Sequence, residues 1–157
     1  METTACVELN PTKAFSHLSN GADSRAFRYM HIQMFPSVTL SLLPQITAQP
    51  FRYIIVDYGV LNPNTLPSFS RCDCKFLIGN ICPWKWKQYY ETIYQIKNNH
   101  RNLYKNIYLL GTPGLKENLT NAHRNISNSI MPVPFIENPF HLTSTDFGFF
   151  EKLLEGK

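Results

Sequence analysis

The chain has 157 residues, of which 43% are apolar and 17% are charged. That length favours a single compact domain over residues 1–157, and the low charge density excludes a disordered chain or a coiled coil. Fifteen basic and eleven acidic residues give a formal net charge of +4 without a long run of like charges, so we expect no dedicated nucleic-acid binding.

The sequence also bears on where the protein works. No stretch approaches the roughly 18 consecutive apolar residues of a membrane-spanning helix, so we expect no transmembrane segment. The first ten residues lack the basic flank and apolar core of a secretory signal. The four cysteines fit a reducing compartment better than a disulfide scaffold, and their spacing is not that of a zinc knuckle. We therefore expect a cytoplasmic protein without zinc.

Short apolar runs alternate along the chain with segments of helical spacing. In chain order, the sequence predicts strands at 4–9 and 28–33, a helix at 37–47, strands at 53–56 and 75–78, a helix at 83–101, a strand at 106–110, a helix at 115–127, a strand at 130–135 and a helix at 144–154. The run at 53–56 is continuously apolar, which is typical of a strand covered on both faces of a parallel sheet. The alternation predicts a three-layer α/β/α fold around one mostly parallel sheet.

The helix predicted at 83–101 carries the clearest signals. A proline at its start suits the first helical turn, where a missing N–H needs no partner. Apolar residues recur at steps of three and four, so we expect a stripe facing the core, formed by Trp86, Tyr90, Ile93 and Ile96. Trp84 falls outside this stripe, so we expect it nearer the surface, beside Lys85 and Lys87, where it is a candidate anchor for a protein partner. The alternative is that Trp84 packs at the rim of the core.

Residues just beyond the carboxyl ends of the predicted strands are the candidate binding site, because ligands of parallel sheets bind there. These residues are Asn10, Asp57, Gly59, Asn80 and the loop around Pro134. An acidic residue that ends an apolar strand, as Asp57 does, can hold Mg²⁺ through water beside a nucleotide phosphate. The alternative is that Asp57 only caps the following loop. We identify no catalytic residue, since the sequence has no G-x-S-x-G motif and its histidines are scattered.

Several segments, taken in order, resemble one protein family. Residues 7–11 read Val-Glu-Leu-Asn-Pro, which looks like the I-D-x-D-P segment that follows the P-loop helix of the ParA/MinD-like deviant-Walker ATPases. The strand that ends at Asp57 resembles their Walker B strand. Residues 72–79, followed by Pro83 and Trp84, resemble their next strand and helix. Residues 131–135 and the helix at 147–154 resemble the strand and loop near the base and the last helix.

The resemblance implies a P-loop NTPase-like fold with ATP and Mg²⁺ as ligands. It implies nucleotide or Mg²⁺ roles for Glu8, Asn10, Asp57, Gly59 and Pro134, with Asp57 as the metal residue. The family's phosphate-binding motif G-x4-G-K-[ST] is absent, however, and the two family aspartates stand here as Glu8 and Asn10. Because an asparagine carries no charge, we expect hydrolysis to be lost, or supplied only in a longer form of the protein.

Two functions follow from this pattern. The resemblance implies a nucleotide-associated regulatory or localisation protein, and the alternative is a non-catalytic interaction module on the same scaffold. The chain is interpreted either as a truncated form of a longer protein or as a relative that naturally lacks the P-loop. In the family, the P-loop strand lies between the strands matched here by 53–56 and 75–78. Its absence leaves unpaired strand edges, so we expect marginal stability or self-association.

Overall fold

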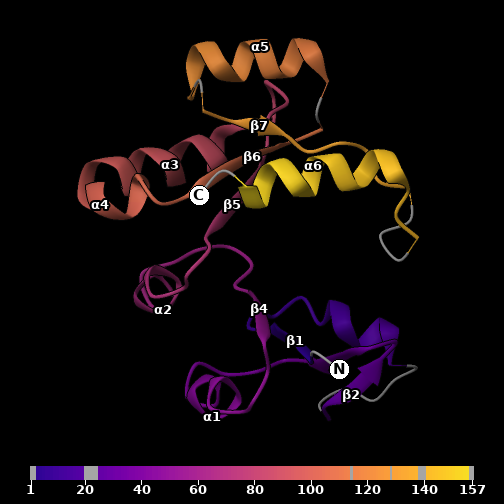
Figure 1. Ribbon diagram of the computed structural model, residues 1–157. Helices are drawn as coiled ribbons and strands as arrows, with labels where there is room; N and C mark the ends of the chain where they lie inside the picture. The colour runs from indigo at the N-terminus through magenta and orange to yellow at the C-terminus, as the bar shows by residue number, and fades with distance from the viewer. Residues whose placement is uncertain (1–2, 20–24, 114, 128, 138–140, 156–157) are drawn as a thin grey trace. The chain divides into compact units, whose positions relative to one another are not determined.

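The computed structural model describes residues 3–19, 25–113, 115–127, 129–137 and 141–155 (Figure 1). The protein is an α/β protein, with six α-helices and seven strands assigned among the described residues. Its contacts divide the chain into two compact units, Met1–Arg71 and Cys72–Lys157, which are described separately. Within the described residues, no helix combines the length and apolar composition that a membrane crossing needs. The single domain expected from the chain length stays a prediction.

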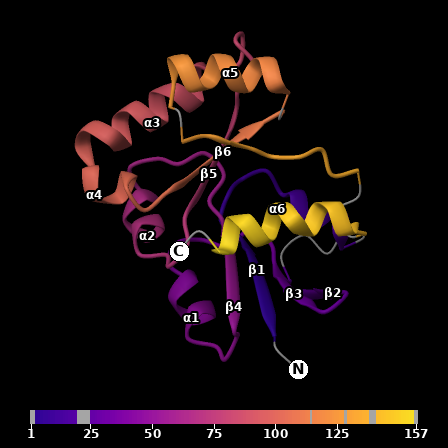
Figure 2. The ribbon, with the colours of Figure 1, turned by 45° about the horizontal axis from the view of Figure 1, so that its top comes forward.

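The first unit contains a mixed four-stranded sheet. Its elements are β1 (Thr4–Glu8), the 3-10 helix η1 (Ala14–Leu18), β2 (Phe27–Tyr29), β3 (Ile32–Phe35), α1 (Leu43–Thr47), β4 (Tyr53–Asp57) and α2 (Leu66–Ser70). The strand order is β2-β3-β1-β4, in which β1 runs parallel to β3 and β4 while β2 is antiparallel to β3. Figure 2 shows β1, β3 and β4 side by side, with α1 beside β4. The segment predicted as one strand at 28–33 is a hairpin: its two ends belong to β2 and β3, and Met30, with a φ of 53°, lies in the turn between them.

One face of this sheet carries the core of the first unit. Val7, Leu43 and Ile46 are buried together, and partly buried side chains of β3, β4 and the flanking loops pack against them. The register pairs Val7 with Val56, so the two side chains point to the same face. Helix α1 therefore covers the face that β1 and β4 share.

Strand β4 is an edge strand. It pairs only with β1 among the described strands, and Tyr53 and Ile55 are exposed, Ile55 to 58%. The sequence predicted a strand covered on both faces, and within the first unit this is wrong, because only the face that carries Ile54 and Val56 packs on the core. The apolar composition of β4 thus exceeds what its own unit buries.

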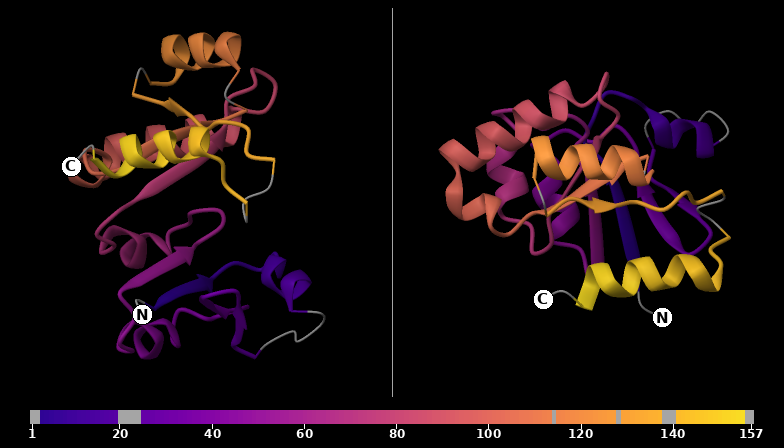
Figure 3. Two further views of the ribbon diagram at one scale, coloured as in Figure 1. Left: turned by 45° about the vertical axis from the view of Figure 1, so that its right-hand side comes forward. Right: turned by 90° about the horizontal axis from the view of Figure 1, so that it is seen from above.

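The second unit contains a three-stranded parallel sheet. Its elements are β5 (Phe76–Asn80), α3 (Lys87–Asn99), α4 (Arg101–Tyr104), β6 (Tyr108–Thr112), α5 (Lys116–Asn125), β7 (Met131–Pro132) and α6 (Ser144–Glu155). The order is β5-β6-β7, with β6 in the centre and β5 at an edge (Figure 3). Because β4 pairs only with β1 and β5 only with β6, the described strands form two sheets rather than the one sheet predicted.

Helices α3 and α5 share an apolar core with the second sheet. The buried members of this core are Ile81, Tyr89, Ile93, Leu109, Ala122 and Ile130. Gly79 of β5 makes the packing of α3 possible, because a Cβ there would lie 2.0 Å from Cγ of the Tyr89 ring. The Tyr89 hydroxyl donates a hydrogen bond to the carbonyl of Leu77 at 3.2 Å. The Tyr89 ring of α3 therefore packs directly against the backbone of β5.

Helix α3 differs from its prediction in two respects. It begins at Lys87 rather than Pro83 and ends before His100, whose non-helical backbone (φ −137°, ψ 56°) separates it from α4. Its buried residues are Tyr89, Ile93 and Ile96. The predicted core position of Tyr90 is therefore wrong, since Tyr90 is exposed and its neighbour Tyr89 is buried instead.

Candidate functional site

The carboxyl ends of β1 and β4 bring together residues from distant parts of the sequence. Glu8 and Asp57 are register partners at the last paired position of these two parallel strands. Just beyond, the Leu9 amide donates to the Asp57 carbonyl at 2.8 Å, and Nδ2 of Asn10 donates to the same oxygen at 3.4 Å. Parallel pairing thus places Glu8, Asn10 and Asp57 at one edge of the sheet, as the strand-end rule predicts for Asn10 and Asp57.

Gly59 completes this group. Its φ is +60°, and a Cβ at this position would lie 2.6 Å from Cβ of Asn10. Glycine is required here for two reasons: the backbone of any other residue would be strained at this positive φ, and its Cβ would collide with the Asn10 side chain. The Gly59 amide donates to Oδ1 of Asp57 at 2.9 Å, so the carboxylate caps the turn that follows β4. We call Glu8, Asn10, Asp57 and Gly59 the strand-end cluster.

Glu8 has a structural role that the sequence did not reveal. Its side chain is completely buried, and Oε1 accepts hydrogen bonds from the Phe15 amide at 3.3 Å and the Thr12 hydroxyl at 3.5 Å. Oε2 accepts from the Ser37 amide at 3.2 Å. Both carboxylate oxygens are therefore engaged by the chain itself. The positive φ of Ser37, 50°, aims its amide at this carboxylate, and no sequence pattern indicates that geometry.

Asn10 is also held by its own loop. The side chain is nearly buried, and Oδ1 accepts from the Thr12 amide at 2.9 Å and from the Thr12 hydroxyl. This arrangement is an Asx turn, in which a short polar side chain stands in for backbone. Asn10 therefore shapes the loop after β1 while its Nδ2 group ties that loop to β4.

Asp57 is the member of the cluster that a ligand can reach. It is exposed, whereas Glu8 and Asn10 are enclosed. A single carboxylate that binds through water suits Mg²⁺, which keeps much of its hydration and takes its other ligands from phosphate. Among the described residues, no group of three or more His, Cys, Asp or Glu side chains forms a ready-made metal site. The donor set thus fits a metal brought by a phosphate better than a metal held by protein alone.

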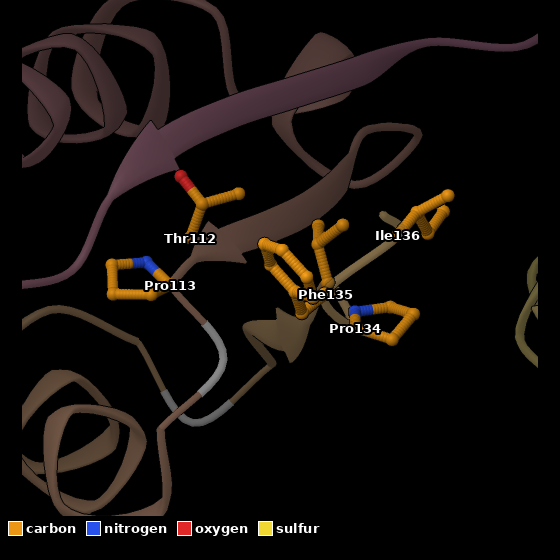
Figure 4. A pocket seen from close by; sticks show the side chains of 6 residues that line it. Thr112, Pro113, Pro134, Phe135 and Ile136 are labelled. Carbon is orange, nitrogen blue, oxygen red and sulfur yellow. The ribbon is translucent and has the colours of Figure 1, made fainter. Parts of the chain in front are cut away.

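Pro134 lies in the second unit and lines a pocket there. The pocket has a volume of about 250 Å³ and is formed beyond the ends of β6 and β7 by Thr112, Pro113, Val133, Pro134, Phe135 and Ile136. Figure 4 places Pro113 on one side of the Phe135 ring and Ile136 on the other. Phe135 is 90% exposed, so it forms an open wall of the pocket. The lining is almost wholly apolar, which suits a flat and weakly polar ligand group.

The remaining candidates of the second unit have separate surroundings. Asn80 uses Oδ1 to accept a hydrogen bond from the Cys82 amide at 2.9 Å, so it caps the turn after β5. Trp84 is 78% exposed, so the alternative that it packs at the rim of the core is wrong within its own unit. In the first unit, burial raises the pKa of the Cys6 thiol and so keeps it protonated.

Comparison with known protein families found no family model that matches the chain, and comparison with curated proteins found no matching sequence.

Proposed function

We propose that the chain is a ParA/MinD-like, nucleotide-associated regulatory or localisation protein of the cytoplasm. One observation carries the proposal. The resemblance selects Glu8, Asn10, Asp57 and Gly59 from segments about fifty residues apart, and they meet at one sheet edge, where Nδ2 of Asn10 donates to the Asp57 carbonyl. Ligands of parallel sheets bind at such edges.

The roles within the proposed site follow from exposure. Asp57 holds a hydrated Mg²⁺ beside phosphate, because its carboxylate is the accessible one of the cluster. Gly59 lets the loop after β4 pass close to Asn10 without a side chain in the way. The apolar pocket at Pro134 belongs to the second unit and is an independent candidate for a flat ring, since proline and aromatic side chains offer flat surfaces to such a group.

Hydrolysis is not part of the proposed function of this chain. The sequence has no G-x4-G-K-[ST] motif to cradle the phosphates, and Asn10 has no charge to offer. The Glu8 carboxylate is fully engaged by Phe15, Thr12 and Ser37. We expect phosphate release from ATP at the background rate. Release above background that disappears in Asp57→Ala would contradict this.

Thermal unfolding in the presence of Mg²⁺ and ATP tests the nucleotide role. A ligand that binds only the folded chain stabilises it by about 2.7 kcal/mol at a hundred times its Kd, so Tm should rise with ATP concentration when Mg²⁺ is present. Asp57→Asn should abolish the metal-dependent part, because an amide is a poor ligand for Mg²⁺. Asp73→Asn, which changes another exposed aspartate, is the matched control and should keep the shift. No shift in the unaltered chain, or a shift that survives Asp57→Asn, rejects the assignment.

Self-association is proposed on separate grounds. Strand β4 has an open edge among the described strands and exposes Tyr53 and Ile55, and apolar strand edges promote association. Light scattering at several concentrations should show a mass that rises with concentration, and Ile55→Lys should reduce this rise. A monomer at high concentration would contradict the expectation.

The second candidate function is a non-catalytic interaction module. The observation in its favour is the exposure of Trp84, a residue type that is favoured at the centre of protein interfaces. Tm that does not respond to ATP, together with partner binding that depends on Trp84, would favour this function over the first.

A further inference from the structure

The net charge of the chain is concentrated in one segment. Residues 83–105, which span α3 and α4, contain five basic residues and one acidic residue, a surplus of four. The whole chain has the same formal surplus, +4, so the rest of the sequence is balanced. The basic residues are Lys85, Lys87, Lys97, Arg101 and Lys105, and all of them are exposed. This part of the second unit therefore presents a positive surface on an otherwise neutral chain.

Exposed aromatic rings occupy the same segment. Tyr90 and Tyr94 stack on each other at 6.0 Å between ring centroids, and Tyr94 is 56% exposed. Trp84, in the turn before the helix, is 78% exposed. Three large aromatic side chains within eleven residues of sequence thus leave apolar area in water, which is typical of a protein-binding surface.

The rings and the charges share one face of α3. Lys87, Tyr90, Tyr94 and Lys97 follow one another at steps of three, four and three residues, which places them along one stripe of a helix. The core residues Tyr89, Ile93 and Ile96 form a different stripe. We call Trp84, Lys87, Tyr90, Tyr94 and Lys97 the α3 surface.

We propose that the α3 surface binds an acidic protein segment, whose apolar side chains cover the three aromatic rings and whose carboxylates pair with the lysines. Charge complementarity selects an acidic partner, and tryptophan and tyrosine are enriched at the centre of protein interfaces, whose rim is polar. The surface runs along a helix, so an amphipathic acidic helix can pack against it side by side. This inference goes beyond the proposed nucleotide function and uses none of its residues.

Other anionic partners fit the surface less well. Glu91 lies within the same face, 3.9 Å from Nζ of Lys87, so the positive charge is interrupted there, whereas a nucleic-acid backbone needs a continuous basic track. The stacking of Tyr90 on Tyr94 occupies a ring face that a nucleic-acid base would need. A second copy of the chain is a poor acidic partner, because the chain has a formal net charge of +4.

Fluorescence anisotropy of the full chain with labelled peptides tests the proposal. The probes are a set of amphipathic peptides with glutamate or aspartate on one face and leucine, isoleucine or phenylalanine at i, i+3, i+4 and i+7 on the other. A polyglutamate peptide of equal charge, a single-stranded oligonucleotide and anionic lipid vesicles serve as comparisons. We expect members of the amphipathic set to bind more tightly than all three comparisons, and their affinity to fall as salt is raised.

Variants of exposed residues locate the binding. Tyr94→Ala and the double variant Lys87→Glu with Lys97→Glu should each weaken peptide binding by about tenfold or more. Phe147→Ala and Lys116→Glu change an exposed ring and an exposed lysine elsewhere in the second unit and should change it less than about twofold. Unchanged melting curves verify the fold of each variant. The proposal is overturned if no peptide of the set binds, if the α3 variants bind like the controls, or if the oligonucleotide or the vesicles bind more tightly.

Discussion

The first unit encloses a carboxylate at the end of β1, whereas the second unit has the larger apolar core. In the first, Val7, Leu43 and Ile46 form the buried cluster, and the completely buried Glu8 lies immediately after Val7. In the second, the buried cluster has six members from strands, helices and loops. The helices differ as well: α1 and α2 have five residues each, and α3 has thirteen.

This difference teaches how each unit is stabilised. Apolar burial grows with the area removed from water and tolerates small shifts, whereas hydrogen bonds to a buried carboxylate depend on the position of each donor. The three donors to Glu8 come from the loop after β1, the short 3-10 helix η1 and the loop after β3. We therefore expect loop order to limit the stability of the first unit, and helix packing to set that of the second.

The largest expected effect comes from removing an isoleucine from each core. Ile93→Ala should lower the free energy of unfolding of the second unit by about 4 kcal/mol, and Ile46→Ala should lower that of the first unit by about 2 kcal/mol. The reason is that side chains around a cavity inside the larger cluster are held on all sides and collapse into it less than those of the small cluster. Hydrogen exchange, followed by mass spectrometry on peptides of each unit, measures the two opening free energies separately. Equal losses would remove the contrast between the two cores.

Adding one methyl group to a glycine sharpens the same contrast. Gly79→Ala should destabilise the second unit by about 3 kcal/mol, because the new Cβ meets the buried Tyr89 ring at 2.0 Å. Gly59→Ala should cost the first unit about 1–2 kcal/mol through its positive φ and its approach to Asn10. Urea unfolding measures both.

Gly148 supplies the control for these glycine variants. It lies within α6 and has no atom within 4 Å of an added Cβ. Gly148→Ala should stabilise the chain by about 0.5–1 kcal/mol, since alanine favours a helix. A loss at Gly79 no larger than that at Gly59 would contradict the close contact between β5 and α3.

The buried carboxylate predicts an intermediate effect that is confined to the first unit. Glu8→Gln should cost about 2 kcal/mol, because the amide turns an NH₂ group toward donors that need an acceptor. Hydrogen exchange should accelerate in η1, which contains Phe15, and in the loop that contains Ser37, and it should stay unchanged in the second unit. Glu91→Gln, at an exposed glutamate, is the control and should change stability by less than about 0.5 kcal/mol. An unaffected first unit would show that the carboxylate is dispensable.

The smallest effect concerns Tyr89 of the second unit. Burial raises the pKa of its phenol, so the folded state keeps the proton at a pH where the unfolded chain loses it. Stability from this group is complete below the ordinary tyrosine pKa of about 10 and is lost as pH rises above it. Tyr89→Phe should cost about 1 kcal/mol at neutral pH by removing the hydrogen bond to Leu77.

The alkaline loss of stability separates this variant from a simple packing change. In Tyr89→Phe, stability should fall less between pH 10 and pH 12 than in the unaltered chain, as measured by urea unfolding at each pH. Tyr94→Phe, at an exposed ring, should leave that dependence in place. The same alkaline fall in all three chains would assign it to other groups.

The sequence alone determined the kind and order of most elements. Strands β1, β4, β5, β6 and β7 and helices α3, α5 and α6 lie at or near their predicted positions, because residue spacing along a strand or helix is a local property. It also selected Glu8, Asn10, Asp57 and Gly59, which meet at one edge because β1 and β4 are parallel. The five-residue helix α2 was missed, since a segment that short shows no full period.

Tertiary structure decided which side chains are covered. The stripe through Trp86 and Tyr90 and the stripe through Tyr89 and Ile96 both have helical spacing, so periodicity could not choose between them. Gly79 of β5 lies outside α3, so the helix sequence does not reveal its effect. Because it has no side chain, it leaves room for the Tyr89 ring and thereby determines which face of α3 turns toward the sheet. The hydrogen bond from the Ser37 amide to Glu8 and the open edge of β4 also depend on how distant segments of the chain pack together. Local spacing sets an element's type, whereas burial depends on neighbours that only the folded chain brings together.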